Sequence, residues 1–196
     1  MMAWLRNNAE QAGWLATWVL IVFMLCMFAT GAIAALTMNE LPLHYIAPPQ
    51  TLIYCILFLL FLYGVRGFAV RMNDASLLRT MNSLMAISVL EMLFYFPFAF
   101  PLFIESNFLT ILLVAMIPLF SVNGILLLRL AENFSVHAPN LGTLGKRIVL
   151  WNKIAGWMMA SVVLIIPGLI VGVVGGFSLW RLLARTRKQS VPAAAA

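Results

Sequence analysis

Apolar residues along this chain gather into five long runs separated by short polar segments. The first four runs cover residues 14–36, 51–70, 81–104 and 107–130. Each is close to or above the roughly 20 residues that an α-helix needs to cross the hydrocarbon core of a bilayer. None shows the two-residue alternation of a transmembrane β-barrel. The pattern therefore predicts an all-α, polytopic integral membrane protein with four firm transmembrane helices.

The fifth run, residues 155–180, is long enough for one crossing and too short for two. Pro167 lies within it and allows two structures. In one, the run is a kinked helix that crosses the membrane, and in the other, Pro167 and Gly168 form the turn of a re-entrant hairpin. We favour the crossing helix, because a stripe of small residues along the run suits close packing against another helix. The stripe consists of Gly156, Ala160, Gly168, Gly172 and Gly176.

Lysine and arginine are distributed unevenly among the connections. The first connection, residues 37–50, and the turn at 105–107 contain none. The second and fourth connections have many in or beside them, namely Arg66, Arg71, Arg79, Arg129, Lys146, Arg147 and Lys153. Short loops rich in Lys and Arg remain in the cytoplasm, so the pattern predicts a cytoplasmic N-terminus in a bacterial inner membrane. A fifth crossing breaks this rule once, because it places the bases after residue 180 on the outside.

The composition indicates a single membrane domain. Of the 196 residues, 64% are apolar and 9% are charged. We assign residues 1–185 to one helical domain and residues 186–196 to a flexible tail. The formal net charge of +6 does not indicate binding of nucleic acid, because the basic residues lie beside apolar segments, where they suit an anionic membrane surface.

Three bases before the fifth run alternate with large apolar residues. Lys146, Arg147 and Lys153 share the segment 144–153 with isoleucine, leucine and tryptophan. Such a segment suits a short interfacial helix whose bases lie near lipid phosphates. The alternative, which we favour, is an ordinary basic anchor beside a transmembrane helix.

One acidic residue lies deep within the apolar runs. A rise of about 1.5 Å per residue places Glu91 close to the bilayer midplane, where a charge costs at least about 2.5 kcal/mol. The same counting brings Arg66, Ser88, Ser121 and Asn123 to the inner half of the membrane. We expect an ion pair between Arg66 and Glu91, hydrogen-bonded by Asn123 and Ser88. This cluster acts either as an interhelical clip, which we favour, or as a site for an ion, a proton or a substrate.

The third run has informative residues at both ends. Asn73 or Asp74 precedes it and is placed to cap the helix N-terminus. At the other end, residues 94–103 combine aromatic rings with two prolines. This stretch suits lipid-facing packing, which we favour, or a groove for a hydrophobic ligand.

The sequence contains no motif for a catalytic, metal or nucleotide site. His44 and His137 fall in connections predicted on opposite sides of the membrane, so they cannot share a metal ion. We therefore expect no enzyme activity, no catalytic residue and no cofactor. The expected function is that of a non-catalytic membrane subunit or accessory protein. It contacts lipids and packs against another membrane protein, or a second copy, through the glycine stripe. The alternative is a small transporter or channel that uses Glu91.

Overall fold

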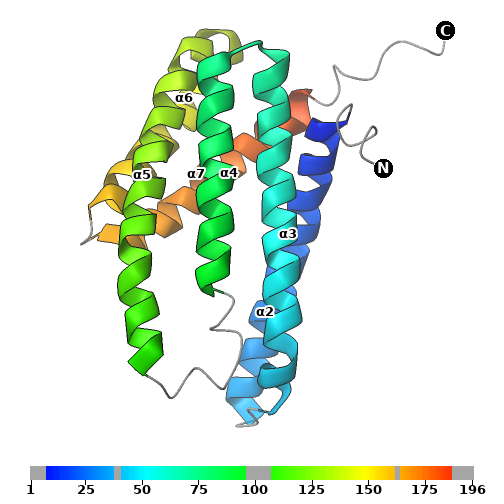
Figure 1. Cartoon of the computed structure of the whole chain (residues 1–196). Coiled ribbons are helices and arrows are strands. Elements are labelled where there is room, and N and C mark those ends of the chain that lie inside the picture. Colours follow the sequence, from blue (N-terminus) through cyan, green and yellow to red (C-terminus); the bar gives the residue numbers. More distant parts are fainter. Residues whose placement is uncertain (1–7, 38–40, 96–106, 162–163, 187–196) are drawn as a thin grey trace, which may run out of the picture.

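The computed structural model describes residues 8–37, 41–95, 107–161 and 164–186, and these residues form six α-helices (Figure 1). The all-α prediction is therefore confirmed. In chain order the helices are α2 (Ala9–Thr37), α3 (Leu41–Arg71), α4 (Ala75–Tyr95), α5 (Asn107–Leu141), α6 (Thr143–Ala160) and α7 (Ile165–Thr186).

The helices form a closed ring of neighbours. Each helix packs against the next one in sequence, and α7 packs against α2, so that the first and last helices also touch. Figure 1 shows α3, α4 and α5 at the front of the bundle, with α6 and α7 behind them. The start of α2 and the end of α7 lie at the same end of the bundle.

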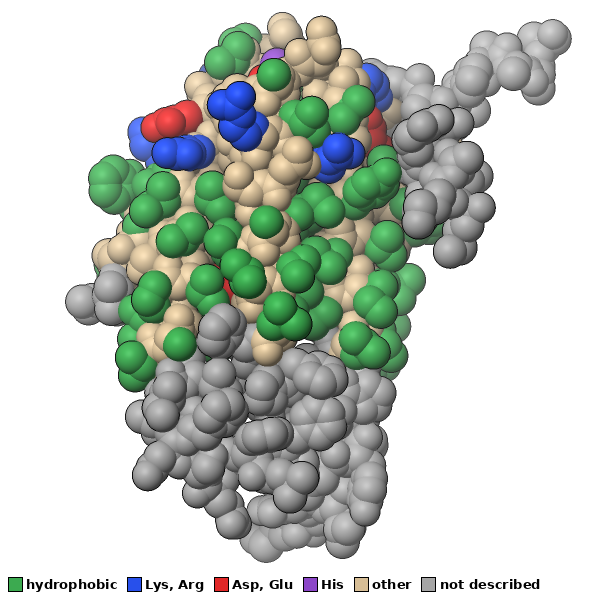
Figure 2. Space-filling model, viewed as in Figure 1, with side chains coloured by type: hydrophobic (Ala, Val, Ile, Leu, Met, Phe, Trp, Pro, Cys, Tyr) green, Lys and Arg blue, Asp and Glu red, His purple; other side chains and the backbone are tan. Residues whose placement is uncertain are grey.

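Charge is concentrated at that end. In Figure 2, the Lys and Arg side chains on the visible face gather near the end where α2 starts and α7 finishes, and hydrophobic side chains cover the region next to it. We call this region, where α3, α5 and α7 finish and α2, α4 and α6 start, the charged end. A charged cap beside an apolar belt is the distribution that a bilayer requires.

Four helices contain a stretch long and apolar enough to cross a membrane. These stretches are Ala9–Cys26, Leu52–Arg71, Val114–Leu141 and Pro167–Thr186, in α2, α3, α5 and α7. The third predicted crossing coincides with α4 only as far as Tyr95. Its remainder, together with most of the aromatic stretch 94–103 and the turn that follows, lies outside the described residues. Residues 187–196, which make up nearly all of the predicted flexible tail 186–196, also lie outside them.

The fifth apolar run is not one helix. α6 ends at Ala160, Ser161 adopts an extended backbone conformation, and α7 begins at Ile165. The expectation of a continuous helix over residues 155–180 is therefore wrong. Pro167 lies in the first turn of α7, where its missing N–H is one that the helix leaves unpaired in any case. The break thus precedes Pro167, and does not occur at Pro167 and Gly168 as the hairpin alternative placed it.

The two helices on either side of this break fold back as a hairpin. α6 packs against α7, and Figure 1 shows the break part-way along the bundle, with both outer ends of the hairpin at the charged end. α6 also begins earlier than the apolar pattern indicated, at Thr143. Its first residues are too polar for a transmembrane run, which is why hydropathy alone placed the start of the segment at residue 155.

The core of the bundle lies toward the charged end. Phe68 of α3 stacks on Phe134 of α5, with ring centroids 5.8 Å apart and planes 5° from parallel. Leu77 and Met81 of α4 and Leu182 of α7 are fully buried in the same cluster. Because lipid is as apolar as these side chains, close packing, and not transfer from water, holds the membrane part of such a cluster together.

Glycines let two helices meet backbone to backbone. A Cβ added at Gly13 of α2 would lie 2.6 Å from the Cα of Gly64 on α3, and one added at Gly67 would lie 2.7 Å from the Cβ of Ala9. Both distances are far below van der Waals contact. This contact was not predicted from the sequence, because the first apolar run starts at Trp14 and leaves Gly13 outside it.

Candidate functional site

Glu91 is buried at the interface of α4 and α5. Its side chain is held by Asn123, whose Nδ2 donates to Oε1 at 3.1 Å and to Oε2 at 3.3 Å. Glu91 is 8% exposed, and Ser88, one turn earlier on the same face of α4, is 3% exposed. The predicted contact between Glu91 and Asn123 is therefore present, with Ser88 buried beside it on the same helix.

The predicted ion pair between Arg66 and Glu91 does not form. Arg66 donates from Nε to Oδ1 of Asn82, at 2.8 Å, and its guanidinium lies 5.9 Å from the ring centroid of Tyr63. Asn82 precedes Glu91 by nine residues, or about 13 Å along the axis of α4. Arg66 is therefore held by residues at about its own depth in the bundle, nearer the charged end than Glu91 is.

Ser121 does not join the cluster. Its hydroxyl donates to the carbonyl oxygen of Ile117, one turn earlier on α5, at 3.2 Å. A position along the helix axis does not fix the direction in which a side chain points around that axis. Of the five residues predicted to meet, the structure brings Glu91 and Asn123 into direct contact.

The Glu91 site is a carboxyl group held by one amide. Within the described parts of the chain, ion pairs join Arg71 to Glu10 and His137 to Asp74, and none involves Glu91. A carboxyl in such surroundings can hold a proton or a small cation, or it can serve only as a hydrogen-bonding partner of Asn123. The contacts are compatible with both roles.

The glycine stripe is divided between several surfaces. Gly156 and Ala160 of α6 face Gly124 of α5, and a Cβ added at Gly156 would lie 2.8 Å from the Gly124 carbonyl oxygen. Gly168 packs at the turn of the hairpin, where an added Cβ would lie 2.8 Å from the backbone nitrogen of Met159. These small residues therefore serve packing within the chain.

Gly172 and Gly176 differ from the others. Among the described residues, a Cβ added at either position would have no neighbouring heavy atom within 4 Å, apart from its own local backbone. Leu169, Val173 and Phe177 on the same side of α7 are exposed. This side of α7 is called the open face below, and it comprises Leu169, Gly172, Val173, Gly176 and Phe177.

A buried asparagine that the sequence analysis did not single out supports the hairpin. Asn152 of α6 is 2% exposed, and its Nδ2 donates to the carbonyl oxygen of Ile148 at 2.8 Å. A Cβ added at Gly175 of α7 would lie 3.2 Å from Oδ1 of Asn152. Gly175 thus lets α7 approach the amide. In the sequence, Asn152 shares a helix face with the apolar residues 148, 155 and 159, and this pattern could have indicated a buried polar residue.

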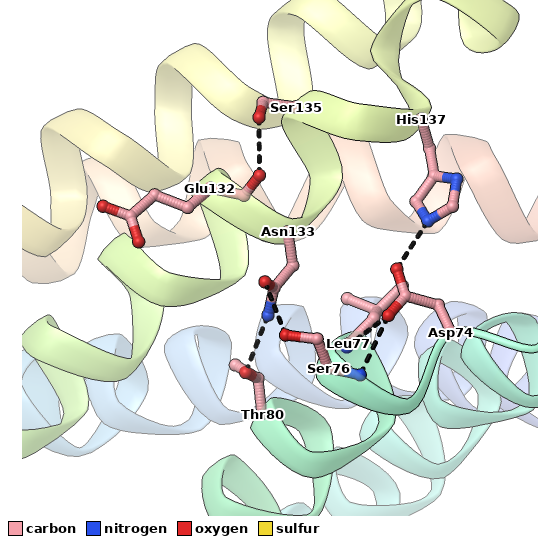
Figure 3. A network of polar contacts seen from close by, with 8 residues as sticks. All are labelled: Asp74, Ser76, Leu77, Thr80, Glu132, Asn133, Ser135 and His137. Atoms are coloured by element: carbon pink, nitrogen blue, oxygen red, sulfur yellow. Dashed lines mark hydrogen bonds and ion pairs between the residues drawn. The ribbon is translucent and has the colours of Figure 1, made fainter.

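Polar side chains connect α4 with α5 at the charged end (Figure 3). Asp74 caps α4, because its Oδ1 accepts from the backbone N–H groups of Ser76 and Leu77, each at 2.9 Å. Its other oxygen contacts Nε2 of His137 at 2.7 Å. The backbone N–H of Leu77 and the hydrogen bond with His137 lower the pKa of Asp74 below its ordinary value of 3.8.

These contacts show which of Asn73 and Asp74 caps α4, and they place His137 on a helix where a connection was predicted. Asp74 is the cap, and Asn73 takes the left-handed conformation with φ of 52°, which asparagine tolerates well. His137 lies on α5, which continues to Leu141 and not only to residue 130. One turn earlier on α5, Asn133 accepts from Ser76 and donates to Thr80 (Figure 3).

Arg71 connects three helices at the same end. Its Nε lies 3.4 Å from Oε1 of Glu10 on α2, and its Nη1 donates to the carbonyl oxygen of Thr186 on α7, at 3.3 Å. The guanidinium also lies 5.6 Å from the ring centroid of Phe68. One side chain at the end of α3 thus contacts the start of α2 and the end of α7.

The predicted basic residues Lys146, Arg147 and Lys153 are all exposed on α6. The opposite side of this helix is buried along its length, through Leu144, Ile148, Ala155 and Met159. The segment is therefore a longer helix than the short interfacial one considered from the sequence. Contact of these bases with lipid phosphates remains a prediction.

No protein-family model, curated protein or solved structure matches this chain. In the described ranges, no group of three or more His, Cys, Asp or Glu side chains is arranged to hold a metal ion.

Proposed function

We propose that this protein is a non-catalytic subunit or accessory protein of a membrane complex, and that the open face of α7 packs against a transmembrane helix of another membrane protein. The observation that carries the proposal is the empty space over Gly172 and Gly176. Glycine costs roughly 1 kcal/mol relative to alanine inside a helix, so a pair of glycines one turn apart is usually explained by a close contact.

The rest of the chain supports this interpretation by comparison. Gly13 and Gly64 meet each other, Gly124 meets Gly156, and Gly175 meets Asn152. Gly172 and Gly176 lack such a contact, although they share the spacing that permits helices to approach closely. A helix from a second protein supplies it.

The orientation belongs to the same proposal. The charged end faces the cytoplasm and the membrane is a bacterial inner membrane, because short segments rich in Lys and Arg are retained on that side. With α6 and α7 returning to the charged end, the bases near the end of α7 obey the same rule as those of the earlier connections. A hairpin thus avoids the one exception to the charge rule that a crossing fifth helix would require.

The test is the composition of the particle extracted from its native membrane in a mild detergent. We expect a stoichiometric second protein with the wild type, and its loss with Gly172→Leu and Gly176→Leu. Because no described part of this chain lies within 4 Å of a Cβ added at either glycine, both variants are expected to fold like the wild type. Val22→Leu, at an exposed position of α2, is the matched control and retains the partner. A wild-type protein that is extracted alone, or variants that keep the partner, would refute the proposal.

A small transporter or channel is the second candidate, and the geometry of Glu91 favours it specifically. Glu91 is buried between α4 and α5 and contacts the neutral amide of Asn123, with no base paired to it in the described structure. An intramembrane acid without a cationic partner is a typical position for coupling a proton or an ion. On this alternative, Glu91→Gln abolishes flux into reconstituted vesicles while the folded yield stays unchanged.

A further inference from the structure

A cavity of about 300 Å³ opens at the charged end between the start of α6 and the end of α7. Its lining consists of Thr143, Leu144, Arg147, Arg181, Ala184 and Arg185. The volume falls at the lower limit of pockets that hold small ligands. The cavity exists because the hairpin returns the last turns of α7 to the first turns of α6.

The lining is strongly basic. Three guanidinium groups border the cavity, and neither α6 nor α7 contains an acidic residue. The ion pairs observed in the described parts of the chain, at Glu10 and Asp74, use none of these arginines. Arg181 instead lies 4.9 Å from the ring centroid of Phe177. The three positive charges are therefore balanced by no group on the helices that carry them.

The first turn of α6 adds hydrogen-bond donors to the same place. Gly142 occupies the N-cap position and has no side chain with which to accept from the first N–H groups of the helix. Thr143, the first helical residue, lines the cavity and contributes a hydroxyl group. The positive end of the helix dipole therefore lies beside the three arginines, and both features favour an anion with several acceptor oxygens.

We propose that this cavity binds a phosphate group, carried by the headgroup of an anionic phospholipid or by a soluble phosphate compound. Arginine suits this ligand because its planar guanidinium donates two parallel hydrogen bonds to phosphate oxygens. The site differs from a general basic anchor, because Lys146 and Lys153 on α6 do not line the cavity. The cavity shares no lining residue with the open face of α7, although Arg181 lies next to Phe177, so this proposal does not depend on the proposed partner.

The experiment uses the full chain, purified in mild detergent and depleted of lipid. Its thermal unfolding is followed while short-chain phosphatidylglycerol, short-chain phosphatidylcholine or inorganic phosphate is added. We expect phosphatidylglycerol to raise the Tm saturably and phosphatidylcholine to have little effect. A saturable rise with inorganic phosphate as well identifies a soluble phosphate compound as the ligand, whereas a rise with the anionic lipid alone identifies a headgroup.

Variants locate the site. Arg147→Gln, Arg181→Gln and Arg185→Gln are each expected to raise the half-saturating ligand concentration by roughly tenfold, since each loses a charge-assisted hydrogen bond. Lys153→Gln removes an exposed base from the same helix and leaves that concentration unchanged. Arg181→Lys retains the charge and loses the paired geometry, so it falls between Arg181→Gln and the wild type.

Two results would overturn the proposal. The first is a wild-type protein whose Tm responds to none of the phosphate-bearing probes. The second is a Lys153→Gln variant that weakens the response as much as the three cavity variants do, because the effect is then one of overall charge. All four arginines and lysines in this series are exposed, so the variants are expected to keep the unliganded Tm of the wild type.

Discussion

Asn123 on α5 donates to both carboxylate oxygens of Glu91 on α4, at 3.1 and 3.3 Å. The one acidic residue of the third apolar run is thus hydrogen-bonded by an amide and does not pair with Arg66. Since Arg66 binds Asn82 instead, the two polar contacts lie at different depths of the bundle and act independently.

This independence predicts the outcome of two double-mutant cycles. Glu91→Gln combined with Asn123→Ala should give a coupling of about 0.6 kcal/mol, the average for polar contacts between membrane helices. Glu91→Gln combined with Arg66→Ala should give none, because the side chains do not touch. The free energy of unfolding of each variant in detergent provides the measurement. Coupling between Arg66 and Glu91 of similar or larger size would contradict the observed contacts.

The contact between Gly13 and Gly64 predicts unequal tolerance of added methyl groups. Gly13→Ala places a Cβ 2.6 Å from a backbone atom of α3, so α2 and α3 must separate. We expect a loss of about 1 to 3 kcal/mol, as for other overpacked interiors. Gly176→Ala serves as the control, because its added Cβ meets open space. Equal thermal stability of both variants in detergent would show that α2 and α3 are not in backbone contact.

The Asp74 cap predicts a loss of stability in acid. Its pKa is lowered in the folded protein, so the carboxylate contributes stability above its ordinary value of 3.8 that is lost as the pH falls through the lower folded value. Asp74→Asn retains a capping side chain and removes the charge, which should flatten the Tm between about pH 5 and pH 2. Asp74→Ala also removes the cap, at a cost of about 1 kcal/mol. If the Tm of Asp74→Asn falls with decreasing pH as steeply as that of the wild type, the acid sensitivity belongs to another group.

The α6–α7 hairpin predicts that both of its outer ends label from the same side of the membrane. With Cys26 and Cys55 replaced by alanine, Lys146→Cys and Arg185→Cys should react with a membrane-impermeant maleimide in inside-out vesicles and not in intact cells. Both native side chains are exposed, so accessibility is set by the membrane alone. Labelling of Arg185→Cys from the opposite side to Lys146→Cys would restore the crossing helix.

The sequence was sufficient to predict the helical class and the residues that meet at Glu91 and Asn123, because run length and axial rise are reliable measures in a membrane. It was insufficient wherever a helix extended past its apolar core. α5 continues to Leu141 and α6 begins at Thr143. His137, which was predicted to lie in a connection, therefore lies on α5. The partner of Arg66 escaped prediction because depth says nothing about rotation around the helix axis.

The break before Pro167 illustrates a different limit. The length of an apolar run gives no information about where the backbone turns. Residues 155–180 are long enough for one crossing, so the run alone predicted one helix. The same composition is equally compatible with the last third of one helix followed by most of the next. The charge rule pointed the other way, because a single crossing at this position would separate the bases after residue 180 from those of the earlier connections.

The contacts of Arg71 with Glu10 and Thr186 have a consequence for biogenesis. Of the described helices, α2 leaves the ribosome first and α7 last, yet α2 packs against α7, where Trp18 meets Trp180 edge to face with ring centroids 5.4 Å apart. Until translation has delivered α7, that flank of α2 is exposed to lipid or to an insertion factor. Closure of the ring therefore requires that α7, the last described helix, has already been synthesised.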